Sequence, residues 1–166
     1  MQQMTDWAAK EGRFLIHLLP DVMAVFDAYV QRSLSDPESG GILLGTVHGP
    51  HIEVTHATPP FPTDRRTRCS FDRGSKGHTE VADQMREESR GIIRYIGEWH
   101  THPEDYPSPS GIDLREWKIS AAKRTDGRPV IGLIVGRKGI YIQGTSAAGK
   151  AIVYQTLLGN CPALDQ

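Results

Sequence analysis

The sequence lacks the features that mark disulfide-rich, membrane-spanning or secreted proteins. Its only cysteines, Cys69 and Cys161, lie far apart and outside any CxxC spacing, so two free thiols are expected rather than a zinc knuckle or a disulfide framework. No run of about eighteen apolar residues occurs. The opening MQQMTDWAAKEGRF lacks the basic and apolar regions of a signal peptide. We therefore expect a soluble, cytoplasmic protein without a membrane partner.

Net charge is also nearly absent. The chain carries 19 Lys and Arg against 20 Asp and Glu, which gives a formal net charge of −1. Such a balance produces no basic field over the whole protein, and this argues against nucleic acid as a partner. A local basic cluster does occur, at Arg65, Arg66, Arg68 and Arg73. Electrostatic attraction of an acidic partner would therefore have to come from this cluster.

The length and the order of patterns predict one domain over residues 1–166. With 166 residues and 38% hydrophobic content, the chain is large enough to bury a core without metal or disulfide crosslinks. Helical and strand patterns alternate along it. Strands are expected at 13–18, 39–47, 51–57, 92–102, 129–135 and 140–143, and helices at 20–34, 75–90 and 110–127. This order predicts an α/β protein with one mixed sheet flanked by helices.

The sequence leaves the structure of two segments undecided. Residues 58–75 are rich in Pro, Arg and Thr and have no clear period, and connections of this length are usually functional or mobile. The segment could guide a substrate, with its arginines meeting an acidic partner, or be a plain surface loop. The tail from 151 to 158 is apolar enough to return to the core as a strand or as a short helix.

One stretch, GEWHTHPEDYPSPSGID at 97–113, concentrates residues that bind metals. His100 and His102 end an apolar run, and alternate residues of a strand project to the same face. Ser110 is a favoured N-cap, so a helix should begin there with Asp113 in its first turn. Two imidazoles and one carboxylate leave a fourth tetrahedral position open, as in hydrolytic zinc sites. The alternative is an HxH pair beside an ordinary helix cap.

The same residues resemble a known motif. HTHPEDYPSPSGID fits HxHP followed by SxxD, with seven residues between the second His and the Ser, and resembles the metal motif of the JAMM metalloproteases, also called JAB or MPN-plus. PESGGILLG at 37–45 resembles the upstream glutamate of that family, which precedes a glycine and a short hydrophobic strand. The resemblance implies a JAB/MPN domain with a curved mixed sheet between helices. It also implies one Zn²⁺ per chain, held by His100, His102 and Asp113.

The resemblance further implies that Glu38 holds the zinc water, takes its proton and delivers it to the leaving amine. Without the motif, Glu38 would be read as a solvated turn carboxylate. Glu98 is a rival base, because it shares a strand face with the two histidines, or it could orient an imidazole. The Ser110 hydroxyl could donate to the oxyanion of the tetrahedral intermediate in addition to capping the helix.

The implied function is zinc-dependent cleavage of the amide bond at the C-terminus of a ubiquitin-like or similarly conjugated protein. The chain looks most similar to bacterial JAB peptidases, among them the deconjugating peptidases of CBASS antiphage operons, which remove a cGAS-like nucleotidyltransferase from lysines. Two alternatives stay open, namely processing of sulfur-carrier proteins and a non-catalytic MPN scaffold. A zinc nucleobase deaminase is disfavoured because its PCxxC ligand pair is missing.

Overall fold

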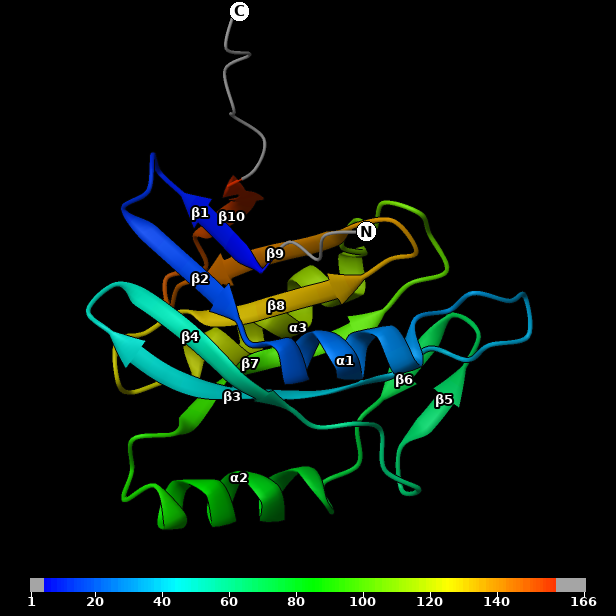
Figure 1. Ribbon diagram of the computed structural model, residues 1–166, viewed down its shortest axis with the longest axis horizontal. Coiled ribbons are helices and arrows are strands. Elements are labelled where there is room, and N and C mark those ends of the chain that lie inside the picture. Colours follow the sequence, from blue (N-terminus) through cyan, green and yellow to red (C-terminus); the bar gives the residue numbers. More distant parts are fainter. Residues whose placement is uncertain (1–4, 158–166) are drawn as a thin grey trace, which may run out of the picture.

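The computed structural model describes residues 5–157, which form ten strands and three helices (Figure 1). The strands are β1 (Asp6–Ala9), β2 (Phe14–Leu18), β3 (Gly40–His48), β4 (His51–Ala57), β5 (Arg65–Thr67), β6 (Ser70–Asp72), β7 (Arg94–Thr101), β8 (Val130–Val135), β9 (Ile140–Thr145) and β10 (Ala151–Thr156). The helices are α1 (Pro20–Tyr29), α2 (His78–Glu88) and α3 (Gly111–Ala122). The expected mixed sheet with flanking helices is confirmed.

Eight of the strands form a closed barrel in the order β1-β10-β9-β8-β7-β3-β4-β2. The β2/β4 and β7/β8 pairs are parallel, and the other six pairs are antiparallel. Closure depends on β1, which hydrogen-bonds both β2 and β10. The sequence did not predict β1, since four residues are too few for a clear period. The apolar tail forms the strand β10, and residue 158 lies outside the described residues.

Helix α1 packs in front of the sheet as Figure 1 is drawn. Proline is favoured at the first position of a helix, and α1 begins at Pro20. Phe26 is buried, and its ring centroid lies 5.0 Å from that of Trp99 on β7. The predicted apolar face ran on to Leu34, and that extension is wrong. The chain turns extended at Val30 and leaves Leu34 81% exposed.

Helix α3 packs behind the sheet (Figure 1). Trp117 is buried and lies directly against Gly132 of β8, where an added Cβ would come within 2.1 Å of the indole. Glycine is therefore required for α3 to approach so closely. The helix ends at Ala122 rather than near Gly127 as expected. This packing brings the N-terminus of α3 beside the end of β7.

The segment 58–75 is not a structureless loop. It contains the antiparallel hairpin β5–β6, which pairs only with itself among the described residues. Three-residue strands without apolar alternation gave no signal in the sequence. Cys69, in the hairpin turn, is an exposed free thiol, whereas Cys161 lies outside the described residues. No helix in residues 5–157 is long and apolar enough to cross a membrane.

Candidate metal site and groove

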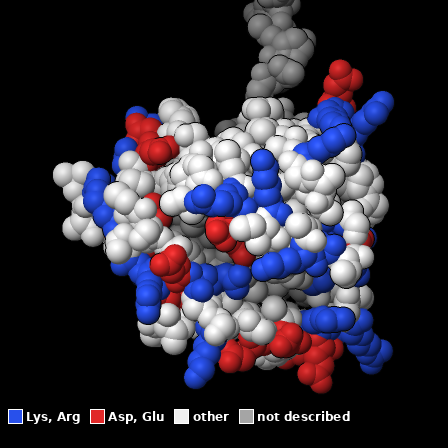
Figure 2. Space-filling view, turned by 180° about the vertical axis from the view of Figure 1, so that it is seen from behind, with Lys and Arg blue, Asp and Glu red and all other residues white. Residues whose placement is uncertain are grey.

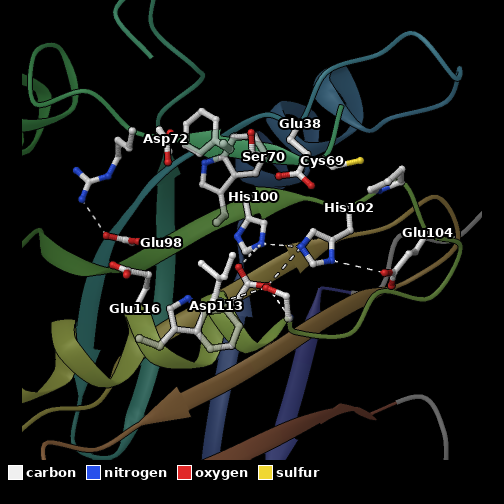
Figure 3. A pocket seen from close by; sticks show the side chains of 18 of the residues that line it. Glu38, Cys69, Ser70, Asp72, Glu98, His100, His102, Glu104, Asp113 and Glu116 are labelled. Carbon is white, nitrogen blue, oxygen red and sulfur yellow. Dashed lines mark hydrogen bonds and ion pairs between the residues drawn. The ribbon is translucent and has the colours of Figure 1, made fainter. Parts of the chain in front are cut away.

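The structure brings His100, His102 and Asp113 together where β7 ends and α3 begins (Figure 3). The two histidine Nε2 atoms are 3.0 Å apart. Oδ1 of Asp113 lies 3.2 Å from His100 Nε2, and Oδ2 lies 3.5 Å from His102 Nε2. Strand alternation supplies the histidine pair and the first helical turn supplies the carboxylate, as the sequence predicts.

The donor set fits a zinc ion. Zn–N bonds of about 2.0–2.1 Å in a tetrahedron separate two nitrogens by roughly 3.3 Å, close to the 3.0 Å between the imidazoles. Neutral imidazole nitrogens and a carboxylate are all electron-pair donors, so their convergence favours a cation between them. Their side chains keep 11–15% exposure. The site is therefore partly shielded yet reachable from solvent.

Ser110 and Asp113 also form a capping box at the start of α3. The Ser110 amide donates to Asp113 Oδ2 at 2.7 Å, and the Asp113 amide donates to Ser110 Oγ at 3.2 Å. The predicted cap is confirmed, and it leaves Asp113 Oδ1 facing His100. Burial raises the pKa of Asp113, but hydrogen bonds with His100, His102 and Ser110 outweigh burial and hold the pKa well below its usual range.

Glu38 lies two residues before β3 and lines the same pocket as the histidines. It is 6% exposed, and Figure 3 shows its carboxylate turned into the pocket toward His102. Burial raises the pKa of Glu38 to about 7; the charge of His102 opposes this shift, and the carboxylates of Asp113 and Glu104 add to it. A carboxyl group that titrates near neutrality can both accept and return a proton.

The backbone of Glu38 is held by β5. Its amide donates to Thr67 O at 2.7 Å, and its carbonyl accepts from Arg66 Nε at 2.8 Å. Arg66 also donates to the Ser39 hydroxyl. Arg66 therefore supports the loop that carries Glu38, and only Arg65 of the adjacent pair stays free to meet a partner as the substrate-guiding hypothesis supposed.

Glu98 does not take either of the roles that the sequence suggested for it. Glu98 accepts from Arg73 at 2.8 Å and from the Tyr95 hydroxyl at 3.3 Å, so it fixes β7 to the segment after β6 rather than facing an imidazole. Glu104 Oε1 instead lies 3.8 Å from His102 Nδ1. Burial lowers the pKa of His102, but the hydrogen bond and charge of Asp113 and the charges of Glu38 and Glu104 raise it overall.

A groove of about 780 Å³ runs over the site. One wall is the stretch from Cys69 to Arg73, which includes β6, and the opposite wall is the exposed start of α3 with Ile112 and Glu116. The hairpin thus lines the groove. Figure 2, seen from the α3 side, shows Lys and Arg interspersed with Asp and Glu. Shape and local contacts, rather than a field of one sign, would select a partner here.

The base of the hairpin is anchored by His78, which sequence reasoning left without a role. His78 is fully buried at the start of α2; Nδ1 lies 2.7 Å from Thr58 Oγ1 and Nε2 lies 2.9 Å from Asp64 Oδ2. Asp64 also accepts from the amides of Phe61 and Gly74. The segment 58–75 is therefore held at its base by a saturated polar cluster. No residue spacing signals it.

Comparisons with known proteins identify the family of this chain. A model of the family described as prokaryotic homologs of the JAB domain matches residues 23–151, a range that includes Glu38, His100, His102, Ser110 and Asp113. Among solved structures, a protein from Desulfitobacterium hafniense determined in solution has a TM-score of 0.56 at 18% identity, with 85% of this chain and 90% of that chain covered. At that identity the likeness concerns the fold alone.

Curated relatives are similar over most of the chain. A Pseudomonas aeruginosa protein named CD-NTase/cGAS isopeptidase is 46% identical over 154 residues, which cover 93% of this chain and 98% of the relative. Proteins of the same name from Escherichia coli and Vibrio cholerae are 38% and 35% identical, covering 75% and 80% of this chain and 78% and 83% of the relatives.

Proposed function

The chain belongs to the family of prokaryotic homologs of the JAB domain, and from this premise we propose that it is a zinc-dependent isopeptidase. The proposal depends most on one observation, the convergence of His100, His102 and Asp113 within 4.8 Å in the floor of a groove. The buried carboxyl group of Glu38 beside them adds the proton carrier that amide hydrolysis needs. A metal-dependent hydrolase of the JAMM type accounts for all four residues.

The substrate we propose is a protein joined through its C-terminus to an amine, in particular a cGAS-like nucleotidyltransferase conjugated to its targets in bacterial antiphage defence. The names of the Pseudomonas, Escherichia and Vibrio relatives support this choice. The groove is bounded on both sides but open at the surface, a shape that suits an extended chain end with a folded protein on either side. We place this activity in the cytoplasm.

His100, His102 and Asp113 would hold the zinc ion, one per chain. When bound, zinc would act as a Lewis acid that polarises the scissile carbonyl and makes a water molecule acidic near neutral pH. Asp113 is fixed in place by the Ser110 cap. Glu104, beyond His102, would favour one orientation of that imidazole.

Glu38 would move the proton. In its ionised form the carboxylate takes a proton from the attacking water, and in its neutral form it returns that proton to the nitrogen of the leaving amine. In the metal-free protein the pKa of Glu38 is raised to about 7, chiefly by burial. The nearby negative charges of Asp113 and Glu104 strengthen the affinity of Glu38 for a proton.

Ser110 would stabilise the developing oxyanion. The Asp113 amide donates to a lone pair of Ser110 Oγ, so that bond leaves the hydroxyl hydrogen able to donate. Ser110 lines the groove beside Asp113, where a substrate carbonyl oxygen would lie. A well-placed donor of this kind contributes about 2.7–4 kcal/mol to the transition state.

The proposal is tested with a nucleotidyltransferase of the cGAS-like class conjugated through its C-terminus to a lysine, with cleavage followed by gel electrophoresis. Wild type should release the free nucleotidyltransferase, and Ser110→Ala should release it more slowly while keeping its metal. Glu53→Gln, on β4 outside the groove, is the control and should cut like wild type. Wild type that carries zinc but leaves both this conjugate and a C-terminal peptide fusion intact would contradict the proposed activity.

A further inference from the structure

A buried polar network lies on the reverse face of the end of β7. Thr101 stands between the two histidines, and strand alternation turns its side chain away from them. Its hydroxyl oxygen accepts from the Ser39 amide at 3.0 Å, and the hydroxyl donates to Gln31 Oε1 at 2.9 Å. Thr101 and Ser39 are both fully buried.

Gln31 is the centre of this network and is also fully buried. Its Nε2 donates to Asp36 O at 3.1 Å and to Arg68 O at 3.0 Å. Gln31 therefore joins three segments that are distant in sequence, namely the loop after α1, the turn of the β5–β6 hairpin and the end of β7. Its amide hydrogens and its carbonyl oxygen all have partners.

The network holds both backbone polar groups of Ser39, the residue that follows Glu38. The Ser39 amide donates to the Thr101 hydroxyl, and the Ser39 carbonyl accepts from the Thr101 amide at 2.8 Å. Thr101 is covalently joined to both His100 and His102. The contacts with β5 hold the backbone of Glu38, and Thr101 is the residue of β7 that links this backbone directly to the candidate metal ligands.

We propose that Thr101 and Gln31 are positioning residues that hold Glu38 at its working distance from the metal ligands. This inference rests on the proposed function, since it assigns the two residues to the proton carrier of that reaction. They touch no substrate and no metal. Misplacing a catalytic group by about 1 Å can lower a rate about 100-fold, so loss of this link should lower kcat while KM stays near its wild-type value.

A second buried glutamine and threonine provide a matched control. Gln143 Nε2 donates to Thr145 Oγ1 at 3.1 Å, and both residues are buried on β9. No residue of β9 lines the groove. Thr101→Val and Thr145→Val each remove one buried hydroxyl without changing the volume of the side chain, but only the first touches the chain beside Glu38.

The experiment compares Thr101→Val, Thr101→Ser, Gln31→Met and Thr145→Val by zinc content, melting temperature, kcat and KM on the conjugate. Thr101→Val and Gln31→Met should keep their zinc and lose about 10- to 100-fold in kcat with KM unchanged. Thr101→Ser keeps the hydroxyl and should restore most of the rate, and Thr145→Val should cut like wild type. Equal losses of kcat in Thr101→Val and Thr145→Val would overturn the inference.

Amide hydrogen exchange at Ser39 can be measured without a substrate. This measurement therefore tests the positioning link independently of the proposed function. In zinc-loaded protein, Ser39 exchange should be faster in Thr101→Val than in wild type and unchanged in Thr145→Val and Thr101→Ser. If wild type cuts no conjugate while this exchange pattern holds, the proposed function fails and the positioning link stands. Unchanged Ser39 exchange in Thr101→Val overturns the link whatever the activity.

Discussion

Among residues 5–157, histidine pairs with aspartate in one exposed surface pair, His17 with Asp6, and in two groupings that are shielded from solvent. The two shielded groupings differ in what they leave open to a ligand. In the first, the side chains of His78 and Asp64 have 0% exposure each, and Thr58 contacts the second ring nitrogen of His78. In the second, the side chains of His100 and Asp113 keep 13% and 15% exposure beside His102. The same residue types thus form a closed cluster in one place and an open one in the other.

The difference lies in where the electron pairs point. Thr58 Oγ1 accepts from the Ile42 amide and lies 2.7 Å from His78 Nδ1, and His78 Nε2 lies 2.9 Å from Asp64 Oδ2. Every donor in that cluster meets an acceptor, which leaves nothing for a ligand. At the end of β7, two ring nitrogens and a carboxylate face one another, and a single bound cation would accept electron pairs from all three. Satisfied pairing indicates structure, and convergent acceptors indicate a metal.

Removal of the metal should have the largest effect. Chelation should lower the rate of conjugate cleavage by more than about 10,000-fold, beyond the share of any single proton-transfer group, and added Zn²⁺ should restore it. The melting temperature of His78→Ala should respond to chelation as wild type does, because His78 takes no part in the metal site. Full activity after complete chelation would place the chemistry elsewhere.

Replacing Glu38 by Gln should have the next largest effect. The amide keeps the shape of the side chain but cannot accept a proton, so kcat should fall about 100- to 10,000-fold with zinc content unchanged. Metal analysis and steady-state kinetics on the same preparation measure both. Glu98→Gln, whose partner is Arg73, serves as control and should lose far less. If kcat instead falls more in Glu98→Gln than in Glu38→Gln, Glu98 rather than Glu38 is the base.

His78→Ala should break the closed cluster and leave the open one intact. Asp64 would remain buried with its charge deprived of one donor, and such losses cost about 3–5 kcal/mol. The free energy of unfolding in urea measures this, with His48→Ala, an exposed strand-end histidine, as control. Zinc content should stay near wild type in both variants. Loss of zinc in folded His78→Ala would mean that the two clusters are not independent.

The smallest effect concerns pH in the metal-free protein. The pKa of Glu38 is raised from 4.5 to about 7, so between these values the folded protein binds more protons than the unfolded chain. Its contribution to stability therefore falls as pH rises through this window. Glu38→Gln removes that dependence. Between pH 4.5 and pH 8, the free energy of unfolding of wild type should therefore fall by about 1–3 kcal/mol relative to that of Glu38→Gln. Parallel pH profiles of the two proteins would contradict the burial of an ionisable Glu38.

The convergence of the candidate metal ligands could be predicted from the sequence because their geometry is local. His100 and His102 share a strand face, and Ser110 and Asp113 share a helical turn, so spacing alone fixes their relation. Glu38 lies far upstream, and only resemblance to a family motif connected it with the histidines. Its approach depends on pairing between β3 and β7, where Gly40 lies opposite His100, and single-sequence patterns do not encode such pairing.

The supporting residues could not be predicted at all. Gln31 donates to the Arg68 carbonyl and Arg66 donates to the Glu38 carbonyl, each from a segment distant in sequence. A carbonyl is the same in every residue, so no pattern of residue types marks these contacts. Closure of the barrel escaped prediction for a similar reason. The short β1 matters through its two neighbours, β2 and β10, rather than through its own composition.

The most direct test asks whether the open cluster, and not the closed one, binds zinc. The zinc content per chain is measured for wild type, His102→Ala and His78→Ala. Each purified protein is dialysed against excess Zn²⁺, freed of unbound metal and subjected to elemental analysis. Our account predicts about one zinc per chain in wild type and in His78→Ala, and none in His102→Ala. Zinc retained by folded His102→Ala, or a wild type that binds none, would contradict the assignment of the open cluster as a metal centre.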